Sequence, residues 1–138
     1  MTVPIDHLIV DATFANPVIE FPSQDEAIIS IDSIVQKAKA MKHKIHIFVY
    51  TIGKEEIFIR LAQKYKTQVV VDEDRFRKLK LCEWCPELFT AQETDDSWIY
   101  VKNTTALSCV EKMDPEKETV LLLTAWKNKY KIQFENFY

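Results

Sequence analysis

The chain has 138 residues, of which 47% are hydrophobic and 28% charged, and its formal net charge is −3 at pH 7. This length predicts one domain, and this composition excludes an intrinsically disordered chain. A chain of this size buries roughly 68–70% of its unfolded surface, so it needs no disulfide framework. The acidic balance excludes the strong, general attraction to phosphate of a basic nucleic-acid-binding domain, so any contact with nucleic acid must be local.

Glycine, histidine and cysteine are scarce, with 1, 3 and 3 residues. Cys82, Cys85 and Cys109 cannot pair completely, and the first residues show no signal segment, so we expect an intracellular, reducing compartment. No apolar run approaches the roughly 20 residues of a membrane helix, so we expect no membrane partner. Cys82 and Cys85 have the spacing of half a zinc site or a redox pair, but no second pair has ligand spacing, which favours a structural role.

Short β-branched runs alternate along the chain with longer amphipathic runs. The first run, residues 7–11, is a candidate for a buried strand. After a turn-rich stretch, Ser23 and Glu26 have the spacing of a capping box, which predicts a helix from there to about Met41. A strand at residues 44–50 follows, with Ile45, Ile47 and Val49 on one face, and a helix begins at Lys54.

The remaining elements continue the same alternation. Further strands are predicted at residues 67–72, 97–101, 119–124 and 130–134, and further helices at residues 74–81 and 104–113. No repeat or low-complexity linker divides the chain. The pattern predicts one α/β domain over residues 1–138, with three layers, a mostly parallel sheet and crossover helices.

In such sheets, ligands bind beyond the carboxyl ends of the strands. Gly53, the single glycine, lies in the turn between the second predicted strand and the helix at Lys54. Free backbone N–H groups at the helix start, the Lys54 ammonium and the Thr51 hydroxyl could together bind one phosphate. Alternatively, Gly53 only allows a tight turn with a positive φ. The turn is neither a P-loop nor a dinucleotide fingerprint, because both need several glycines.

Other polar residues at strand ends allow two interpretations each. Asp11 is either a buried carboxylate with a functional partner or an ordinary turn residue. Thr13 could donate a hydrogen bond to a phosphate or cap a turn. The acidic run at residues 72–74 most simply caps a helix. His43 and His46 are three residues apart, which places them on opposite faces of a strand, so we do not expect them to share a metal.

Three segments carry a more specific signal: Asp11-Ala-Thr-Phe-Ala-Asn-Pro17, Phe21-Pro-Ser-Gln-Asp-Glu26 and Tyr50-Thr-Ile-Gly-Lys-Glu55. In this order they resemble the β-CASP region of the DNA cross-link repair nuclease family, the Artemis/Apollo group of the metallo-β-lactamase superfamily. The similarity continues through Thr67-Gln-Val-Val-Val71 and Glu87-Leu-Phe-Thr90, so it covers nearly the whole chain.

The resemblance implies a small α/β domain that closes over a DNA end, opposite a metallo-β-lactamase-like half that carries the metal. The 5′ phosphate of the substrate would lie in the cleft between them. Asp11 would lie against the metal centre and support its ligands. Thr13, Thr51, Gly53 and Lys54 would contact the phosphate. No cofactor is implied for this chain, whereas zinc or another divalent metal is expected in the other half.

The sequence departs from the family pattern at two points. The metal-binding signature His-x-His-x-Asp-His is absent. Where the last family motif has a histidine, alignment of residues 130–138 places Phe137. The first departure implies that the chain alone does not cut DNA. The second implies either that the end of the chain is degenerate or that the chain stops early.

Three functional hypotheses follow from these observations. In the first, the chain is the β-CASP domain of a nuclear 5′-to-3′ exonuclease that acts on DNA ends in interstrand cross-link repair or telomere maintenance. The metal-bearing half would lie in the same or another chain, and DNA repair or telomere proteins would be partners. In the second, it is a catalytically dead relative that binds or scaffolds proteins. In the third, the ordered motifs are coincidental and the chain is an unrelated doubly wound nucleotide binder.

Overall fold

The computed structural model describes residues 6–12, 15, 20–50 and 52–124. In chain order, its elements are α1 (Gln24–Ala40), β1 (Lys44–Val49), α2 (Glu55–Tyr65), β2 (Val69–Val71), α3 (Glu73–Leu81), the 3₁₀ helix η1 (Pro86–Leu88), β3 (Phe89–Thr90), β4 (Ile99–Asn103), the 3₁₀ helix η2 (Thr104–Lys112) and β5 (Glu118–Leu122). Among these residues, no helix has the length and apolarity of a membrane span.

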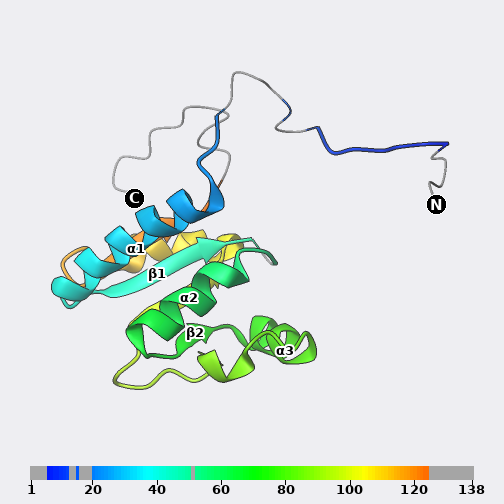
Figure 1. Cartoon of the computed structure of the whole chain (residues 1–138). Coiled ribbons are helices and arrows are strands. Elements are labelled where there is room, and N and C mark those ends of the chain that lie inside the picture. Colours follow the sequence, from blue (N-terminus) through cyan, green and yellow to red (C-terminus); the bar gives the residue numbers. More distant parts are fainter. Residues whose placement is uncertain (1–5, 13–14, 16–19, 51, 125–138) are drawn as a thin grey trace.

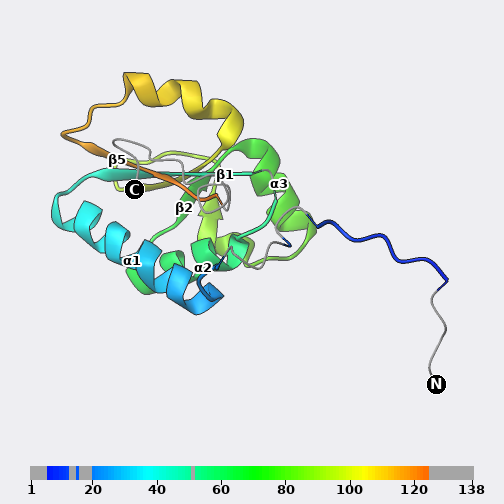
Figure 2. The ribbon, with the colours of Figure 1, turned by 90° about the horizontal axis from the view of Figure 1, so that it is seen from above.

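The strands form one five-stranded sheet in the order β3-β2-β4-β1-β5. Every neighbouring pair is parallel, and the central pair has Ile47 beside Val101. Helices α1 and α2 cover one face of the sheet and η2 lies on the opposite face (Figures 1 and 2). The predicted three-layer α/β fold with a mostly parallel sheet is therefore confirmed.

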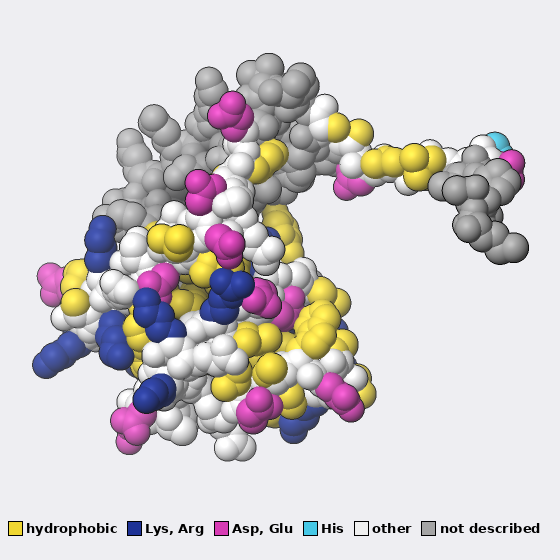
Figure 3. Space-filling model, in the orientation of Figure 1, with side chains coloured by type: hydrophobic (Ala, Val, Ile, Leu, Met, Phe, Trp, Pro, Cys, Tyr) yellow, Lys and Arg dark blue, Asp and Glu magenta, His cyan; other side chains and the backbone are white. Residues whose placement is uncertain are grey.

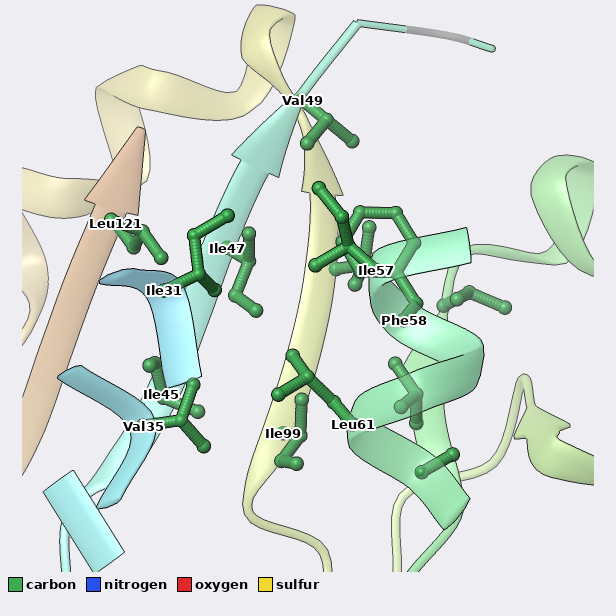
Figure 4. Close-up of a cluster of buried hydrophobic side chains, with 14 of the residues drawn as sticks. Ile31, Val35, Ile45, Ile47, Val49, Ile57, Phe58, Leu61, Ile99 and Leu121 are labelled. Atoms are coloured by element: carbon green, nitrogen blue, oxygen red, sulfur yellow. The ribbon is translucent and has the colours of Figure 1, made fainter. Parts of the chain in front are cut away.

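The core lies between the sheet and the two long helices. β1 alternates along its length, so Ile45, Ile47 and Val49 all point to the side of α1 and α2, as the sequence predicts. Figure 4 shows them with the side chains that pack against them: Ile31, Val35, Ile57, Phe58, Leu61, Ile99 and Leu121. This apolar layer fixes the direction in which β1 leaves the sheet.

The start of α1 carries the predicted capping box. The Glu26 N–H donates to Ser23 Oγ at 3.2 Å, and the Ser23 N–H donates to Glu26 Oε2 at 2.8 Å. The Ser23 hydroxyl and N–H together lower the pKa of the Glu26 carboxyl. Two backbone donors at the helix start are thus satisfied by one reciprocal pair.

The predicted strand at residues 7–11 is wrong. The segment forms no strand in the structure, and its apolar side chains are exposed, with Ile9 98% accessible. It leads away from the body of the domain as an extended chain whose apolar side chains are uncovered (Figures 1 and 3). Among the described residues, no strand lies beside it to complete its hydrogen bonds. The predicted strand at residues 130–134 lies outside the described residues.

Candidate functional site

The sheet brings the carboxyl ends of β1 and β4 together at one edge. β1 leads into α2 on one face, whereas β4 leads into η2 on the opposite face (Figure 2). Adjacent parallel strands whose connections leave toward opposite faces mark the point where ligands bind in open α/β sheets. The turn after β1 lies at this point and contains Gly53 and Lys54.

The turn between β1 and α2 contains two residues with left-handed backbone angles in succession, Gly53 with φ 105° and Lys54 with φ 72°. A Cβ added at Gly53 would meet no atom within 4 Å, so the glycine is required by the backbone angle and not by space. The Lys54 side chain is exposed, with Nζ 5.8 Å from the centre of the Tyr50 ring. Thr51 lies outside the described residues.

A buried arginine of α3 holds this turn. Arg75 is only 4% exposed. Its Nη2 donates to the Tyr50 carbonyl oxygen at 2.6 Å, and its Nη1 donates to Glu55 Oε1 at 3.2 Å. The same Glu55 oxygen accepts a hydrogen bond from the Gly53 N–H at 3.1 Å. One guanidinium group therefore ties together the end of β1, the turn and the start of α2.

Sequence reasoning missed Arg75, although two signals were present. Asp72 caps α3 by accepting from the Arg75 N–H at 2.8 Å, which confirms that the acidic run caps a helix. Arg75 precedes Leu79 by four residues, and these two are the buried residues of α3. Residues four apart share a helix face, so the apolar position of Leu79 already placed Arg75 on the buried face.

The phosphate-binding residues predicted from the sequence are in part already engaged. The Gly53 N–H is bonded to Glu55, so a phosphate at this N–H would have to displace a carboxylate. Lys54, in contrast, forms no ion pair among the described residues. Asp11 is exposed, in the segment that leads away from the body, and Thr13 lies outside the described residues (Figure 1).

A pocket of about 880 Å³ lies on the other face, between the sheet and η2. Asp72 and Asn103, at the carboxyl ends of β2 and β4, line it, and so do His46, Tyr100 and Lys102 on the sheet. The pocket thus has residues of both charge signs. Sequence reasoning missed this pocket. Its floor is formed by every second residue of the strands, on the face of the sheet that points away from the apolar core.

His46 is the most enclosed ionisable side chain of this pocket. Its Nε2 lies 2.8 Å from Glu118 Oε1, and its Nδ1 has no hydrogen-bond partner among the described residues. Burial, with Lys102 adding to it, lowers the pKa of His46. Nearby, the Tyr100 hydroxyl donates to Glu93 Oε1 at 2.6 Å. Burial and this carboxylate raise the pKa of Tyr100.

No metal site is evident in the described part of the chain. Among residues 6–12, 15, 20–50 and 52–124, no group of three His, Cys, Asp or Glu side chains could hold a metal ion. Cys82, Cys85 and Cys109 are free thiols.

Comparison with known proteins identifies DNA repair relatives. The 5′ exonuclease Apollo of Gallus gallus is 35% identical over 64% of this chain and 19% of its own length. The DNA cross-link repair 1A protein of Homo sapiens is 29% identical over 64% of this chain and 9% of its own. DNA ligase 6 of Arabidopsis thaliana is 28% identical over 70% and 7%, respectively. The resemblance to the Artemis/Apollo nuclease family is confirmed. No family model matches the chain.

The similarity to the Artemis/Apollo family concerns a part of each relative. The chain spans between 7% and 19% of the lengths of the three proteins above. The match therefore concerns one part of these proteins, and it assigns no role to single residues. The roles of Asp11, Thr13, Thr51, Gly53 and Lys54 stay predictions.

Proposed function

We propose that this chain is the β-CASP domain of a DNA repair 5′-to-3′ exonuclease, where it closes over a DNA end and contacts the 5′ phosphate. Four relatives named 5′ exonuclease Apollo support this proposal, at 32–35% identity over 62–64% of the chain. The chain spans 14–19% of their lengths. Nuclear localisation and DNA repair or telomere proteins as partners belong to the same proposal.

The proposed phosphate contact rests on one observation, the position and exposure of Lys54. Its side chain is exposed and makes no ion pair among the described residues. Lys54 also follows the carboxyl end of β1, at the point of the sheet where the connections after β1 and β4 leave toward opposite faces. Its Nζ lies beside the half-exposed ring of Tyr50. A cation next to an exposed aromatic ring suits the end of a single strand, where phosphate and base are adjacent.

The rest of the surface supports weak binding of DNA by this chain alone. Acidic and basic side chains are interspersed on the face shown in Figure 3, and the net charge is −3. Counterion release from several phosphates, which drives strong DNA binding, is therefore small. Affinity would come from the one local contact and from whatever the other half of the enzyme adds.

The exposed apolar segment at Leu8, Ile9 and Val10 supports the need for another half. Contiguous apolar side chains uncovered on one segment mark a surface that another protein surface covers. We propose a metallo-β-lactamase-like half, in the same or another chain, as that surface and as the source of zinc or another divalent metal. Because the described residues do not fit a metal, no step of the hydrolysis is assigned to them. Alone, the chain is expected to be inactive.

A complementation assay tests this function. The chain is mixed with a metallo-β-lactamase-like half, divalent metal and a 5′-phosphorylated single strand, and nucleotide release is followed. Lys54→Ala and Asp11→Asn should slow the release. Lys66→Ala is the matched control, because Lys66 is also an exposed lysine with a positive φ, at the opposite end of the same helix. Equal release by wild type, Lys54→Ala and Asp11→Asn would refute the roles proposed for both residues.

The second candidate function is a catalytically dead scaffold that binds proteins. In its favour is the alignment expected from the resemblance, which places Phe137 where the last family motif has a histidine. This candidate predicts no nucleotide release with any metal-bearing half, and recovery of a protein partner in a pull-down at mild salt. A pull-down that recovers none would count against it.

A further inference from the structure

We propose that Arg75 is a positioning residue for the phosphate contact, because it fixes the backbone of the turn that carries Lys54. This inference rests on the proposed function, in which Lys54 contacts the 5′ phosphate. Arg75 itself would not touch the DNA, since its side chain is 4% exposed. Its action would pass through two groups of the turn, the Tyr50 carbonyl and the Gly53 N–H.

The contacts of Arg75 close both ends of the turn on one group. Tyr50 is the first residue after β1, and its carbonyl oxygen accepts from Nη2 at 2.6 Å. Gly53 lies three residues on, and its N–H reaches the same guanidinium through Glu55 Oε1, with distances of 3.1 and 3.2 Å. The left-handed conformations of Gly53 and Lys54 are thus held from within the protein.

Arginine is suited to this arrangement in a way that lysine is not. The planar guanidinium presents several N–H donors in a fixed fork, so one side chain can serve a carbonyl and a carboxylate at once. Both hydrogen bonds involve a charged donor, and such bonds are roughly twice as strong as neutral ones. The single ammonium of a lysine in this place would have to serve both acceptors from one point.

Burial makes the pair sensitive to the loss of one partner. The side chains of Arg75 and Glu55 are 4% and 11% exposed. Two charges taken out of water contribute little net stability, but the removal of one leaves the other buried and uncompensated. If Arg75 is lost, Glu55 should therefore turn toward water and release the Gly53 N–H.

The direct test is amide hydrogen exchange of the full 138-residue chain by NMR. Arg75→Met and Arg75→Lys should accelerate exchange at Gly53 while the amides of β1 stay protected. Arg77→Met is the matched control, since Arg77 lies on the same helix with its side chain 71% exposed. If Gly53 exchanges as slowly in both Arg75 variants as in wild type, Arg75 does not hold the turn.

The functional test is a titration of the same proteins with 5′-phosphorylated and 5′-hydroxyl trinucleotides. Each variant is measured at a temperature at which it is fully folded, so that a loss of stability alone changes nothing. Arg75→Lys should lose as much preference for the phosphorylated strand as Lys54→Ala does, and Arg77→Met should keep it. Arg75→Met serves as a second variant if the lysine variant does not fold.

The two proposals fail in different ways. If wild type shows no preference for the 5′ phosphate, the proposed phosphate contact fails and the inference fails with it. If wild type shows a preference that is lost in Lys54→Ala but retained in folded Arg75 variants, the proposed function stands and the role of Arg75 is refuted. If the double variant of Lys54 and Arg75 loses no more preference than either single variant, the two residues act through one turn.

Discussion

The imidazole of His46 stacks on the ring of Tyr100, with ring centroids 4.8 Å apart and planes 23° apart. This stack lies at the floor of the pocket under η2, with Lys44, Lys102 and Glu118 around the imidazole. Burial and the two lysines lower the pKa of His46 more than Glu118 raises it. The histidine is therefore neutral in the folded chain at pH 7.

Acidification below about pH 6.5 should destabilise the chain because His46 must be buried in its neutral form. A histidine in the unfolded chain has a pKa of about 6.5, whereas the pKa of folded His46 is lower. Just below a pH of about 6.5, the unfolded state therefore binds a proton that the folded state does not bind. The free energy of unfolding should rise with pH up to about 6.5. Urea denaturation at several values of pH between 5 and 8 measures this slope.

His46→Gln should flatten this pH dependence, whereas His7→Gln, at an exposed position, should retain it. The carboxyl groups with lowered pKa values, among them Glu118, add a dependence of the same sign at lower pH. The pH range that decides lies just below about 6.5, the ordinary pKa of histidine. If the free energy of unfolding of wild type and of His46→Gln has the same slope in that range, His46 is not buried in its neutral form.

The capping box of α1 should be measurable by itself. Ser23→Ala removes the acceptor of the Glu26 N–H and should cost about 0.5–2 kcal/mol in the free energy of unfolding. Ser33→Ala, within the same helix, removes only a hydroxyl that donates to the Ser30 carbonyl and should change stability little, because alanine is the best helix former. Urea denaturation compares both with wild type, and equal stability of the two variants would be inconsistent with a capping role.

Phe58 should be among the most costly residues to truncate. Its side chain is 0% exposed and lies on the face of α2 that covers the sheet (Figure 4). Phe58→Ala should cost about 3–5 kcal/mol through lost apolar burial and the cavity left behind. Ile29→Ala, at an exposed position of α1, should change stability by less than about 0.5 kcal/mol. Thermal and urea denaturation measure both, and a small effect at Phe58 would mean that the layer repacks.

Lys66→Gly should stabilise the chain. Lys66 ends α2 with φ 51° and ψ 47°, a left-handed conformation that costs a residue with a Cβ about 1–2 kcal/mol. Part of the relief is lost to the greater freedom of glycine when unfolded, so we expect a gain of about 0.5–1 kcal/mol. Lys37→Gly, the same change inside α1, should instead cost about 1 kcal/mol. Opposite signs in urea denaturation confirm the prediction, and equal signs contradict it.

Most elements were predictable because each leaves a local pattern in the sequence. The capping-box spacing of Ser23 and Glu26 predicts α1, and the alternation of Ile45, Ile47 and Val49 predicts β1. The two residues of β3 are too few to show alternation, so this strand was missed. The run at residues 7–11 has the composition of a strand, but composition cannot reveal whether a neighbour exists to pair with it.

The site was predictable in its position but not in its contacts. The turn at Gly53 could be found because a single glycine between a strand and a helix is visible in the sequence. However, five residues have a positive φ without being glycine, so their conformation could not be read from the sequence: Lys42, Lys54, Lys66, Glu83 and Cys85. The hydrogen bond from Arg75 to Tyr50 joins residues 25 positions apart, and only the packing of α3 against the turn after β1 brings them together.

The order of the strands has a consequence for synthesis on the ribosome. β1 is the first strand made, yet its neighbours in the sheet are β4 and β5, the last strands of the described chain. Until residue 103 has left the exit tunnel, both edges of β1 are unpaired, and the edge that pairs with β5 stays unpaired until residue 122 has left it. Folding of this domain should therefore be slow and late, as for other folds dominated by contacts between distant residues. Nascent chains that stop before β4 should depend on chaperones to stay soluble.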